Sequence, residues 1–237
     1  MTDGLCKECD GTGWVIKKRD NREVAVKCDC QKADIFFSKG KRANIPPRFL
    51  GAELSSFFPD EKRPSLLKAK QAAETFIEDY PAVTDGLIFQ GPTGVGKTRL
   101  LCSIATGIMR RLDDIEVYYI DWNDLVRLMR SGEDASSRDY YAINELVQKL
   151  TSVDLLLFDE FGASKVSPWV YDNIYFVINR RYNTQKITCF ASNFMDGADN
   201  DGRESLKIRV GERIRSRLFE MATAIEMKGS DYRKLNG

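Results

Sequence analysis

The sequence predicts an α/β fold in which a mostly parallel β-sheet is covered by helices on both faces. Strand and helix patterns alternate along the chain, and the strand segments are nearly continuous apolar runs, as in sheets buried on both sides. The expected strands are residues 86–90, 116–121, 153–159, 186–192 and about 222–227. The expected helices, marked by apolar residues three or four apart, are residues 65–80, 97–111, 122–130, 140–151, 168–183 and 203–221.

The composition fits one α/β domain with a small appendage. The chain has 237 residues, of which 43% are hydrophobic, and this is enough to fill a core. Its 36 basic and 35 acidic residues give a net charge of +1, so a nucleic acid would have to be bound by local patches. We find neither a signal segment nor an apolar run of the ~20 residues that span a membrane, so we expect a cytoplasmic protein. The lack of histidine excludes His-based acid–base catalysis.

The chain divides into three parts by composition. Residues 1–40 are expected to form a small module, because the polar, glycine-punctuated start holds four of the six cysteines. Residues 41–64 contain four prolines and are expected to form a connector. Residues 65–237 carry the alternating pattern and are expected to form the α/β core.

The segment Gly91–Thr98 reads G-P-T-G-V-G-K-T, a complete Walker A sequence between an expected strand and an expected helix. Its glycines let successive N–H groups point at one phosphate chain, at the start of a helix that favours anions. Lys97 would reach the β- and γ-phosphates, and the Thr98 hydroxyl would hold Mg²⁺. A chance glycine turn is the alternative, which the strand and helix on either side disfavour. The predicted ATP-binding residues are Gly91, Pro92, Thr93, Gly94, Val95, Gly96, Lys97, Thr98, Arg99 and Asp159.

Two later strands end in polar side chains that would complete this site. The run Leu155–Glu160 has the Walker B pattern, in which Asp159 would hold Mg²⁺ through water and Glu160 would orient or deprotonate the attacking water. Paired acids that merely cap a strand in solvent are the alternative. Asn193 follows the next strand at the carboxyl edge of the sheet, where it could hold the attacking water and sense the γ-phosphate. Taken alone, Ser-Asn after a strand is ordinary turn chemistry.

A basic helical segment, Lys207–Arg217, follows these strands. Arg213 and Arg217 are four residues apart and share a helical face. One explanation is a solvated basic surface. The other is a catalytic arginine that enters the ATP site of a neighbouring subunit and offsets transition-state charge. The residue pattern favours neither.

Four segments occur in the order seen in one family. They are the Walker A segment, the Walker B segment, Ala-Ser-Asn193 and Glu-Arg-Ile-Arg-Ser-Arg217-Leu. Together they resemble the AAA+ ATPases of the DnaC/DnaI helicase-loader and IstB transposition-helper group, from Ile45-Pro-Pro-Arg-Phe49 to the C-terminus. The cysteine-rich start, from Cys6 to Cys30, also resembles the N-termini of phage and Gram-positive members of this group. The resemblance implies a five-stranded parallel AAA+ core without a C-terminal helical lid. It matches Asn193 to sensor 1, Arg217 best and Arg213 second to the arginine finger, and Arg233 to a sensor-2 arginine.

The cysteines near the start pair as Cys6-x2-Cys9 and Cys28-x-Cys30, separated by eighteen residues. Four thiolates at the ends of a short hairpin can close a tetrahedral Zn²⁺ site, and metal binding would then stabilise a segment too small to fold alone. Two disulfides or free thiols are the alternative. Cys102 and Cys189 fall in a helix and a strand and are expected to be core thiols.

The resemblance also indicates where partners would bind. In loaders the N-terminal domain contacts the replicative helicase, although the basic residues around Trp14 would equally suit nucleic acid. In that clade the helical insertion, here residues 122–151, touches single-stranded DNA. Solvated charges on amphipathic helices explain its basic residues equally well. The candidate phosphate contacts in this insertion are Arg127, Arg130, Arg138 and Lys149.

The leading hypothesis is therefore an ATPase that loads a DnaB-like hexameric replicative helicase onto single-stranded DNA. It would assemble with itself or on the helicase, and hydrolysis by the isolated monomer would be weak because the arginine comes from a neighbour. The main alternative is an IstB-like transposition helper. A P-loop kinase of small molecules and a nucleotide-gated adaptor that hydrolyses almost no ATP are less favoured, because of Asn193 and Glu160 respectively.

Overall fold

The computed structural model describes residues 6–19, 22–59, 62–133, 137–197 and 204–232. Its centre is the expected five-stranded parallel sheet, in which the strands are ordered β4-β5-β6-β3-β7. The strands are β3 Gly86–Gln90, β4 Val117–Asp121, β5 Leu155–Asp159, β6 Ile187–Ser192 and β7 Ala222–Glu226. Because all five are parallel, their carboxyl ends meet at one edge of the sheet, where ligands of open α/β sheets bind.

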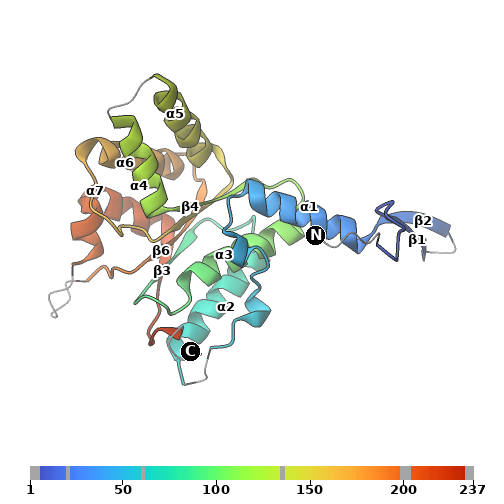
Figure 1. Ribbon diagram of the computed structural model, residues 1–237. Helices are drawn as coiled ribbons and strands as arrows, with labels where there is room; N and C mark the ends of the chain where they lie inside the picture. The colour runs from blue at the N-terminus through green and yellow to red at the C-terminus, as the bar shows by residue number, and fades with distance from the viewer. Residues whose placement is uncertain (1–5, 20–21, 60–61, 134–136, 198–203, 233–237) are drawn as a thin grey trace.

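Helices cover both faces of this sheet (Figure 1). One face packs against α2 Pro64–Asp79 and α3 Lys97–Arg111. The other packs against α4 Trp122–Glu133, α5 Ser137–Ser152, α6 Pro168–Asn183 and α7 Leu206–Met221. Side chains alternate between the two cores along each strand, so Tyr119 of β4 belongs to the α2–α3 side and the neighbouring Tyr118 to the α4–α7 side.

The N-terminal part is a hairpin followed by a helix, and it extends away from the sheet (Figure 1). The hairpin pairs β1 Trp14–Arg19 with β2 Arg22–Lys27, and Trp14 lies opposite Lys27. Helix α1, Asp29–Arg42, leads from the hairpin to the core and was not expected from the sequence. Its Gly40 is buried so closely against Leu50 that a β-carbon at residue 40 would lie 2.5 Å from a Leu50 methyl group. Gly40 is a residue type that disfavours helices, but here it allows α1 to pack closely against Leu50.

Helix α1 ends directly on the edge strand of the sheet. Asn44 takes a left-handed φ of 58°, and the N–H groups of Asn44 and Ile45 bond back to the carbonyls of Lys41 and Gly40. This arrangement satisfies the last carbonyls of the helix and turns the chain. The N–H of Tyr119 in β4 then donates to the carbonyl of Ala43 at 2.8 Å, and the Asn44 side-chain amide donates to the carbonyl of Tyr119 at 3.0 Å. The end of α1 is thus fixed to β4.

The chain after β7 returns across the glycine loop that follows β3. The N–H of Met227 donates to the Gln90 carbonyl at 2.7 Å, and the N–H of Tyr232 donates to the Gly94 carbonyl at 3.1 Å. Within the described residues, which end at Tyr232, no α-helix follows β7. The sensor-2 candidate Arg233 lies outside the described residues. None of the helices in the described ranges is long and apolar enough to cross a membrane.

Candidate nucleotide site and cysteine cluster

The glycine loop lies between the buried strand β3 and the N-terminus of α3. Gly94 and Gly96 have φ values of 84° and 105°, which side chains other than glycine rarely adopt. A β-carbon at Gly94 would lie 2.0 Å from a carboxylate oxygen of Asp231, and one at Gly96 would lie 2.7 Å from the Phe57 ring. The loop is therefore confined on both sides, and its conformation depends on these two glycines.

Lys97, the first residue of α3, points its amine back into the loop. The side chain is buried, and its Nζ donates to the carbonyls of Gly91 and Pro92 at 2.8 Å each and to Oδ1 of Asn193 at 2.6 Å. Three oxygens thus surround one cation next to a helix N-terminus. Phosphate oxygens carry more negative charge than these neutral acceptors and would compete for the same amine.

The two carboxylates at the tip of β5 have different surroundings. Asp159 is buried, and its Oδ2 accepts from the Tyr119 hydroxyl at 2.7 Å while its Oδ1 accepts from the Glu160 N–H at 2.9 Å. Glu160 is half-buried and takes a left-handed φ of 51°, a conformation that costs on the order of 1–3 kcal/mol outside glycine. Its Oε2 accepts from the Asn193 amide at 3.2 Å. Asn193 therefore connects Lys97 to Glu160 through the two ends of one amide.

Burial perturbs the acid–base chemistry of this edge. The pKa of Glu160 is raised, first by burial and then by the negative charges of Asp159 and Asp121, while Lys97 and the Asn193 amide oppose the rise. Burial and the adjacent Asp159 also raise the pKa of the Tyr119 hydroxyl, which therefore keeps its proton and remains a donor to Asp159. A carboxylate with a raised pKa is a stronger base, which suits the proton-accepting role expected of Glu160.

The loop and the strand ends surround a cavity of about 320 Å³. Lys97, Thr98, Glu160 and Asn193 all line it, so the structure brings together residues from three separate motifs. Four of the predicted ATP-binding residues do not line it: Val95, whose side chain is buried in the α2–α3 core, and Gly91, Pro92 and Asp159. The other lining residues are Arg48, Phe49, Thr93, Gly94, Gly96 and Arg99.

Two of the lining residues had no expected role. Arg48 and Phe49 belong to the Ile45–Phe49 segment, and the Arg48 guanidinium lies 4.5 Å from the centre of the Phe49 ring. The only sequence signal was an arginine and an aromatic residue directly after two prolines. A larger hollow, of about 970 Å³, lies between α1, α3 and α5. None of the predicted nucleotide-site residues lines it, but Lys149, a candidate phosphate contact of the insertion, does.

Both candidate arginine fingers lie on α7 and contact tyrosines of α6 rather than the cavity. The Arg213 guanidinium lies 4.0 Å from the Tyr175 ring centre, and that of Arg217 lies 4.1 Å from the Tyr182 ring centre. Arg217 also forms a 3.4 Å ion pair with Glu220. Neither arginine lines the cavity of its own chain.

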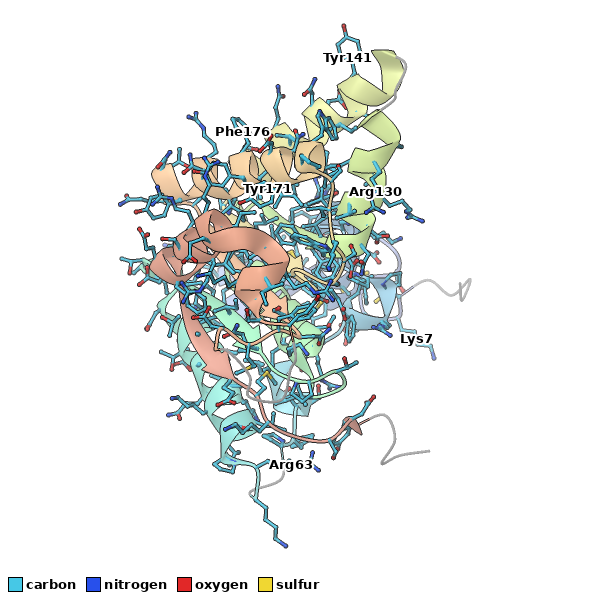
Figure 2. All side chains as sticks on the ribbon, turned by 90° about the vertical axis from the view of Figure 1, so that its left-hand side faces the viewer. Lys7, Arg63, Arg130, Tyr141, Tyr171 and Phe176 are labelled. Carbon is cyan, nitrogen blue, oxygen red and sulfur yellow. The ribbon has the colours of Figure 1, made fainter. Side chains whose placement is uncertain are left out.

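The insertion expected at residues 122–151 forms α4 and α5 on the outside of the α4–α7 layer. Figure 2 shows Arg130 on this outer surface and Tyr141 at its far end, and the Tyr141 side chain is 69% exposed. Arg127 pairs with Asp124 at 3.1 Å, and Arg130 donates to the Lys165 carbonyl at 2.9 Å. Both basic groups remain exposed in these contacts. The amine of Lys149 lies over the Tyr118 ring, and the Arg138 side chain lies outside the described residues.

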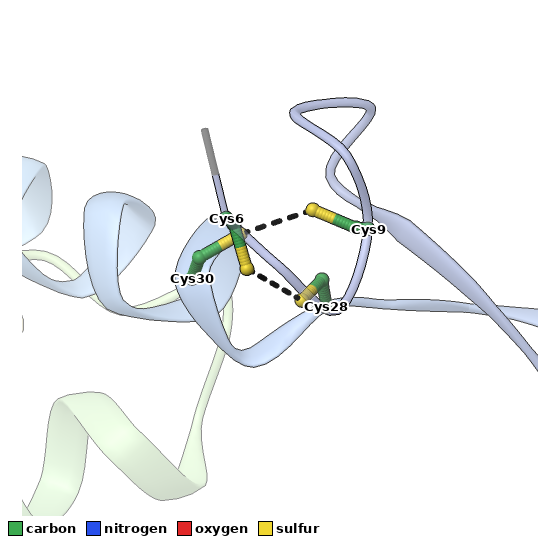
Figure 3. A group of neighbouring side chains, drawn as sticks. All are labelled: Cys6, Cys9, Cys28 and Cys30. Atoms are coloured by element: carbon green, nitrogen blue, oxygen red, sulfur yellow. Dashed lines mark hydrogen bonds between the residues drawn. The ribbon is translucent and has the colours of Figure 1, made fainter. Parts of the chain in front are cut away.

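The four N-terminal cysteines gather where the hairpin meets α1 (Figure 3). Their Sγ atoms all lie within 4.8 Å of one another, with Cys6 and Cys28 3.8 Å apart and Cys9 and Cys30 3.5 Å apart. Sulfurs on a tetrahedral zinc with bonds of ~2.3 Å lie about 3.8 Å apart, so the cluster has the size of such a site. None of the six cysteines forms a disulfide in the described residues, and the fully buried Cys102 and Cys189 are core residues as predicted.

The four thiols influence one another's ionisation. Burial acts to raise the pKa of Cys9, but hydrogen bonds from the Gly13 N–H and from neighbouring thiols lower it to about 7. The thiols of Cys28 and Cys9 raise the pKa of Cys30 to about 12. Binding of a divalent cation would release the protons that the four thiols still hold.

The strand order is β4-β5-β6-β3-β7, the glycine loop follows the interior strand β3, and the two acids stand at the tip of β5. This arrangement defines a P-loop nucleotide-binding protein of the AAA+ class. The chain belongs to the IstB-like ATP binding protein family, whose pattern matches residues 63–236.

Two curated relatives and one solved structure indicate the branch. The replicative helicase loader DnaI of Bacillus subtilis is 25% identical over 89% of this chain and 67% of its own length. The replicative helicase loader DnaC of Buchnera aphidicola (strain APS) is 29% identical over 67% of this chain, which spans only 58% of that protein. A crystal structure of the DnaC helicase loader superposes with a TM-score of 0.64 at 26% identity and covers 77% of this chain and 100% of its own. The resemblance seen in the sequence is thereby confirmed.

Proposed function

We propose that this protein is an ATP-dependent replication factor that loads a hexameric replicative helicase onto single-stranded DNA. The observation that carries the proposal is the Lys97–Asn193–Glu160 connection around one cavity, in a chain whose relatives include helicase loaders. An amide that contacts both the loop lysine and the candidate base can register whether a γ-phosphate is present. Such a connection suits a nucleotide-driven switch better than the conversion of a metabolite.

The motif residues of the candidate nucleotide site have roles that follow from their chemistry. The N–H groups of the glycine loop and the Lys97 amine would bind the phosphates, and Arg99 and Thr93 line the same opening. The Thr98 hydroxyl and the Asp159 carboxylate are oxygen donors of the kind that Mg²⁺ prefers, and the ion would neutralise phosphate charge. Glu160 would orient the attacking water and accept its proton, and Asn193 would hold Glu160 in position.

A neighbouring subunit would complete the site. Arg217 and Arg213 are held on the surface by tyrosine rings of α6 and lie outside their own cavity. Either could reach the phosphates of an adjacent copy, where a guanidinium offsets transition-state charge. We therefore infer that hydrolysis is slow in the monomer and rises on self-assembly or on assembly with the helicase.

The cysteine cluster would hold a structural zinc ion. Its four sulfurs are close enough for tetrahedral coordination, and the hairpin has almost no core of its own, since Trp14, Ile16 and Val24 are all exposed. Such exposed apolar side chains on a metal-stabilised hairpin suit contact with a partner protein. We assign this surface to the helicase.

The rival function is that of an IstB-like transposition helper, which the family itself supports. The extent of alignment does not separate the two roles, because DnaI aligns over 89% of this chain and the insertion sequence IS232 putative ATP-binding protein of Bacillus thuringiensis over 92%. We favour the loader because the solved structures of DnaC and DnaI superpose on this fold with a TM-score of 0.64 each. Residues 122–151 would contact single-stranded DNA in either role.

Affinity purification from the host with the Glu160→Gln variant and ATP tests the assignment. This variant should retain ATP and hold its partner, and the matched control Lys97→Ala should bind neither. Co-elution of the hexameric replicative helicase with Glu160→Gln alone would support loading. Co-elution of a transposase would select the rival function, and equal recovery of the helicase with both variants would remove nucleotide control from the proposal.

A further inference from the structure

The side chain of Tyr119 forms a hydrogen bond with the carboxylate of Asp159 at the tip of the neighbouring strand. Its hydroxyl donates to Asp159 Oδ2 at 2.7 Å, and both side chains are buried, with exposures of 6% and 2%. The pairing of β4 with β5 explains the contact. Tyr119 lies opposite Leu157, two residues before Asp159, so the tyrosine and the aspartate share the face that packs on α3. The long Tyr119 side chain therefore reaches from β4 to the carboxyl end of β5.

This bond fixes the orientation of the Asp159 carboxylate without using up its acceptors. Oδ2 accepts from Tyr119, and Oδ1 accepts from the N–H of Glu160 at 2.9 Å. An ionised carboxylate has about four acceptor positions, so both oxygens keep unused acceptor positions for a further donor such as metal-bound water. Partners that orient a ligating group in this way typically change metal affinity about 10- to 100-fold when they are removed.

The backbone of Tyr119 is held as firmly as its hydroxyl. β4 is an edge strand, and its free side at residue 119 is occupied by the end of α1. The Tyr119 N–H donates to Ala43, and its carbonyl accepts from the Asn44 amide, whose left-handed conformation ends the helix. Helix α1 begins next to Cys28 and Cys30, so one short series of contacts joins the cysteine cluster to the strand that carries Tyr119.

We propose that Tyr119 is a positioning residue that orients Asp159 for Mg²⁺ and ties the position of this carboxylate to the end of helix α1. The inference rests on the proposed magnesium role of Asp159. It gives the N-terminal module a physical connection to the nucleotide site, because a shift of α1 moves the backbone of Tyr119 and with it the hydroxyl that holds Asp159.

The test compares Tyr119→Phe with Tyr118→Phe in the full chain. Tyr118 precedes Tyr119 in the same strand and lies on the opposite face of the sheet. Each variant therefore loses one tyrosine hydroxyl, but only Tyr119→Phe loses the hydroxyl that contacts Asp159. Equilibrium binding of a fluorescent ATP analogue is titrated with Mg²⁺, and binding of Mn²⁺ in its place is followed by electron paramagnetic resonance. Tyr119→Phe should raise the half-saturating metal concentration about tenfold. Its affinity for the analogue in EDTA should match the wild type, which also shows that the variant is folded.

Asp159→Asn separates failure of the inference from failure of the proposed function. If Asp159→Asn leaves the metal dependence unchanged, Asp159 has no magnesium role and the proposed function is wrong at this residue. If Asp159→Asn weakens metal binding while Tyr119→Phe does not, the positioning role of Tyr119 is refuted and the proposed function stands.

Asn44→Gly tests the connection to α1. Glycine keeps the left-handed turn but removes the amide that holds the Tyr119 carbonyl. We expect the same direction of change as for Tyr119→Phe, at about two- to threefold, well below the 10- to 100-fold effect of a direct partner. An unchanged metal dependence in Asn44→Gly would refute the connection.

Discussion

Replacement of Asn193 by alanine would break the connection between Lys97 and Glu160 at its centre. The change removes the 2.6 Å bond to Lys97 and the 3.2 Å bond to Glu160, but leaves both charged groups in the cavity. A hydrogen bond to a charged group contributes about 1.5–3 kcal/mol. If the bond that orients Glu160 is retained in the transition state, its loss slows hydrolysis about 10- to 150-fold, because each ~1.4 kcal/mol is a factor of ten.

The same substitution should shift the pH dependence in a defined direction. The Asn193 amide lowers the pKa of Glu160, which burial and two neighbouring carboxylates raise. Glu160 must be ionised to accept a proton, so activity falls as the pH drops through its raised pKa. Without Asn193 this pKa rises further, and the acid limb of the rate profile should move to higher pH.

Single-turnover release of phosphate from Mg²⁺-ATP, in the assembled complex and across pH, measures both effects. The matched control is Asn183→Ala, which removes an exposed amide at the end of α6. A hydrolysis rate within threefold of the wild type, together with an unshifted acid limb, would show that Asn193 does not orient Glu160.

Three further results are expected. Lys97→Ala should abolish binding of a fluorescent ATP analogue, and unchanged affinity would contradict a phosphate role for the glycine loop. Arg217→Ala should slow hydrolysis in the assembled complex about 10³-fold or more while sparing analogue binding by the monomer; Arg180→Ala, an exposed arginine of α6, should do neither. The purified chain should contain one zinc ion, and its removal by a chelator should expose Cys6, Cys9, Cys28 and Cys30 to thiol reagents. Full reactivity of these thiols before chelation would exclude the zinc site.

The sheet and its helices could be predicted from the sequence because their patterns are strong and mutually consistent. Each strand is a short apolar run bounded by polar residues, and the strands of the structure begin and end within two residues of their expected limits. Helix α1 was missed because its polar residues and the K-G-K-R run at its end resemble a linker. Only the fold shows that Gly40 faces Leu50, where a side chain would not fit.

Some residues of the candidate site could likewise be predicted from the sequence, and others could not. Lys97, Glu160 and Asn193 could be identified because each stands at a fixed place in a motif, and motif order implies that strand ends meet. The bond from Tyr119 to Asp159 could not be found from the sequence, because it depends on which strands are neighbours and in what register. If the pairing of β4 with β5 had been known, it would have indicated that Tyr119 lies near Asp159. Arg48 and Phe49 reach the cavity across a connector whose path no local pattern specifies.

The most direct test of the central claim is deposition of the replicative helicase on closed circular single-stranded DNA, which has no end for a ring to thread. The number of hexamers retained on the circle is counted after challenge with competitor DNA, with and without this protein and ATP. We predict retention that requires both, and that fails with Lys97→Ala. Equal retention without ATP, or none with the wild-type protein, would contradict nucleotide-driven helicase loading.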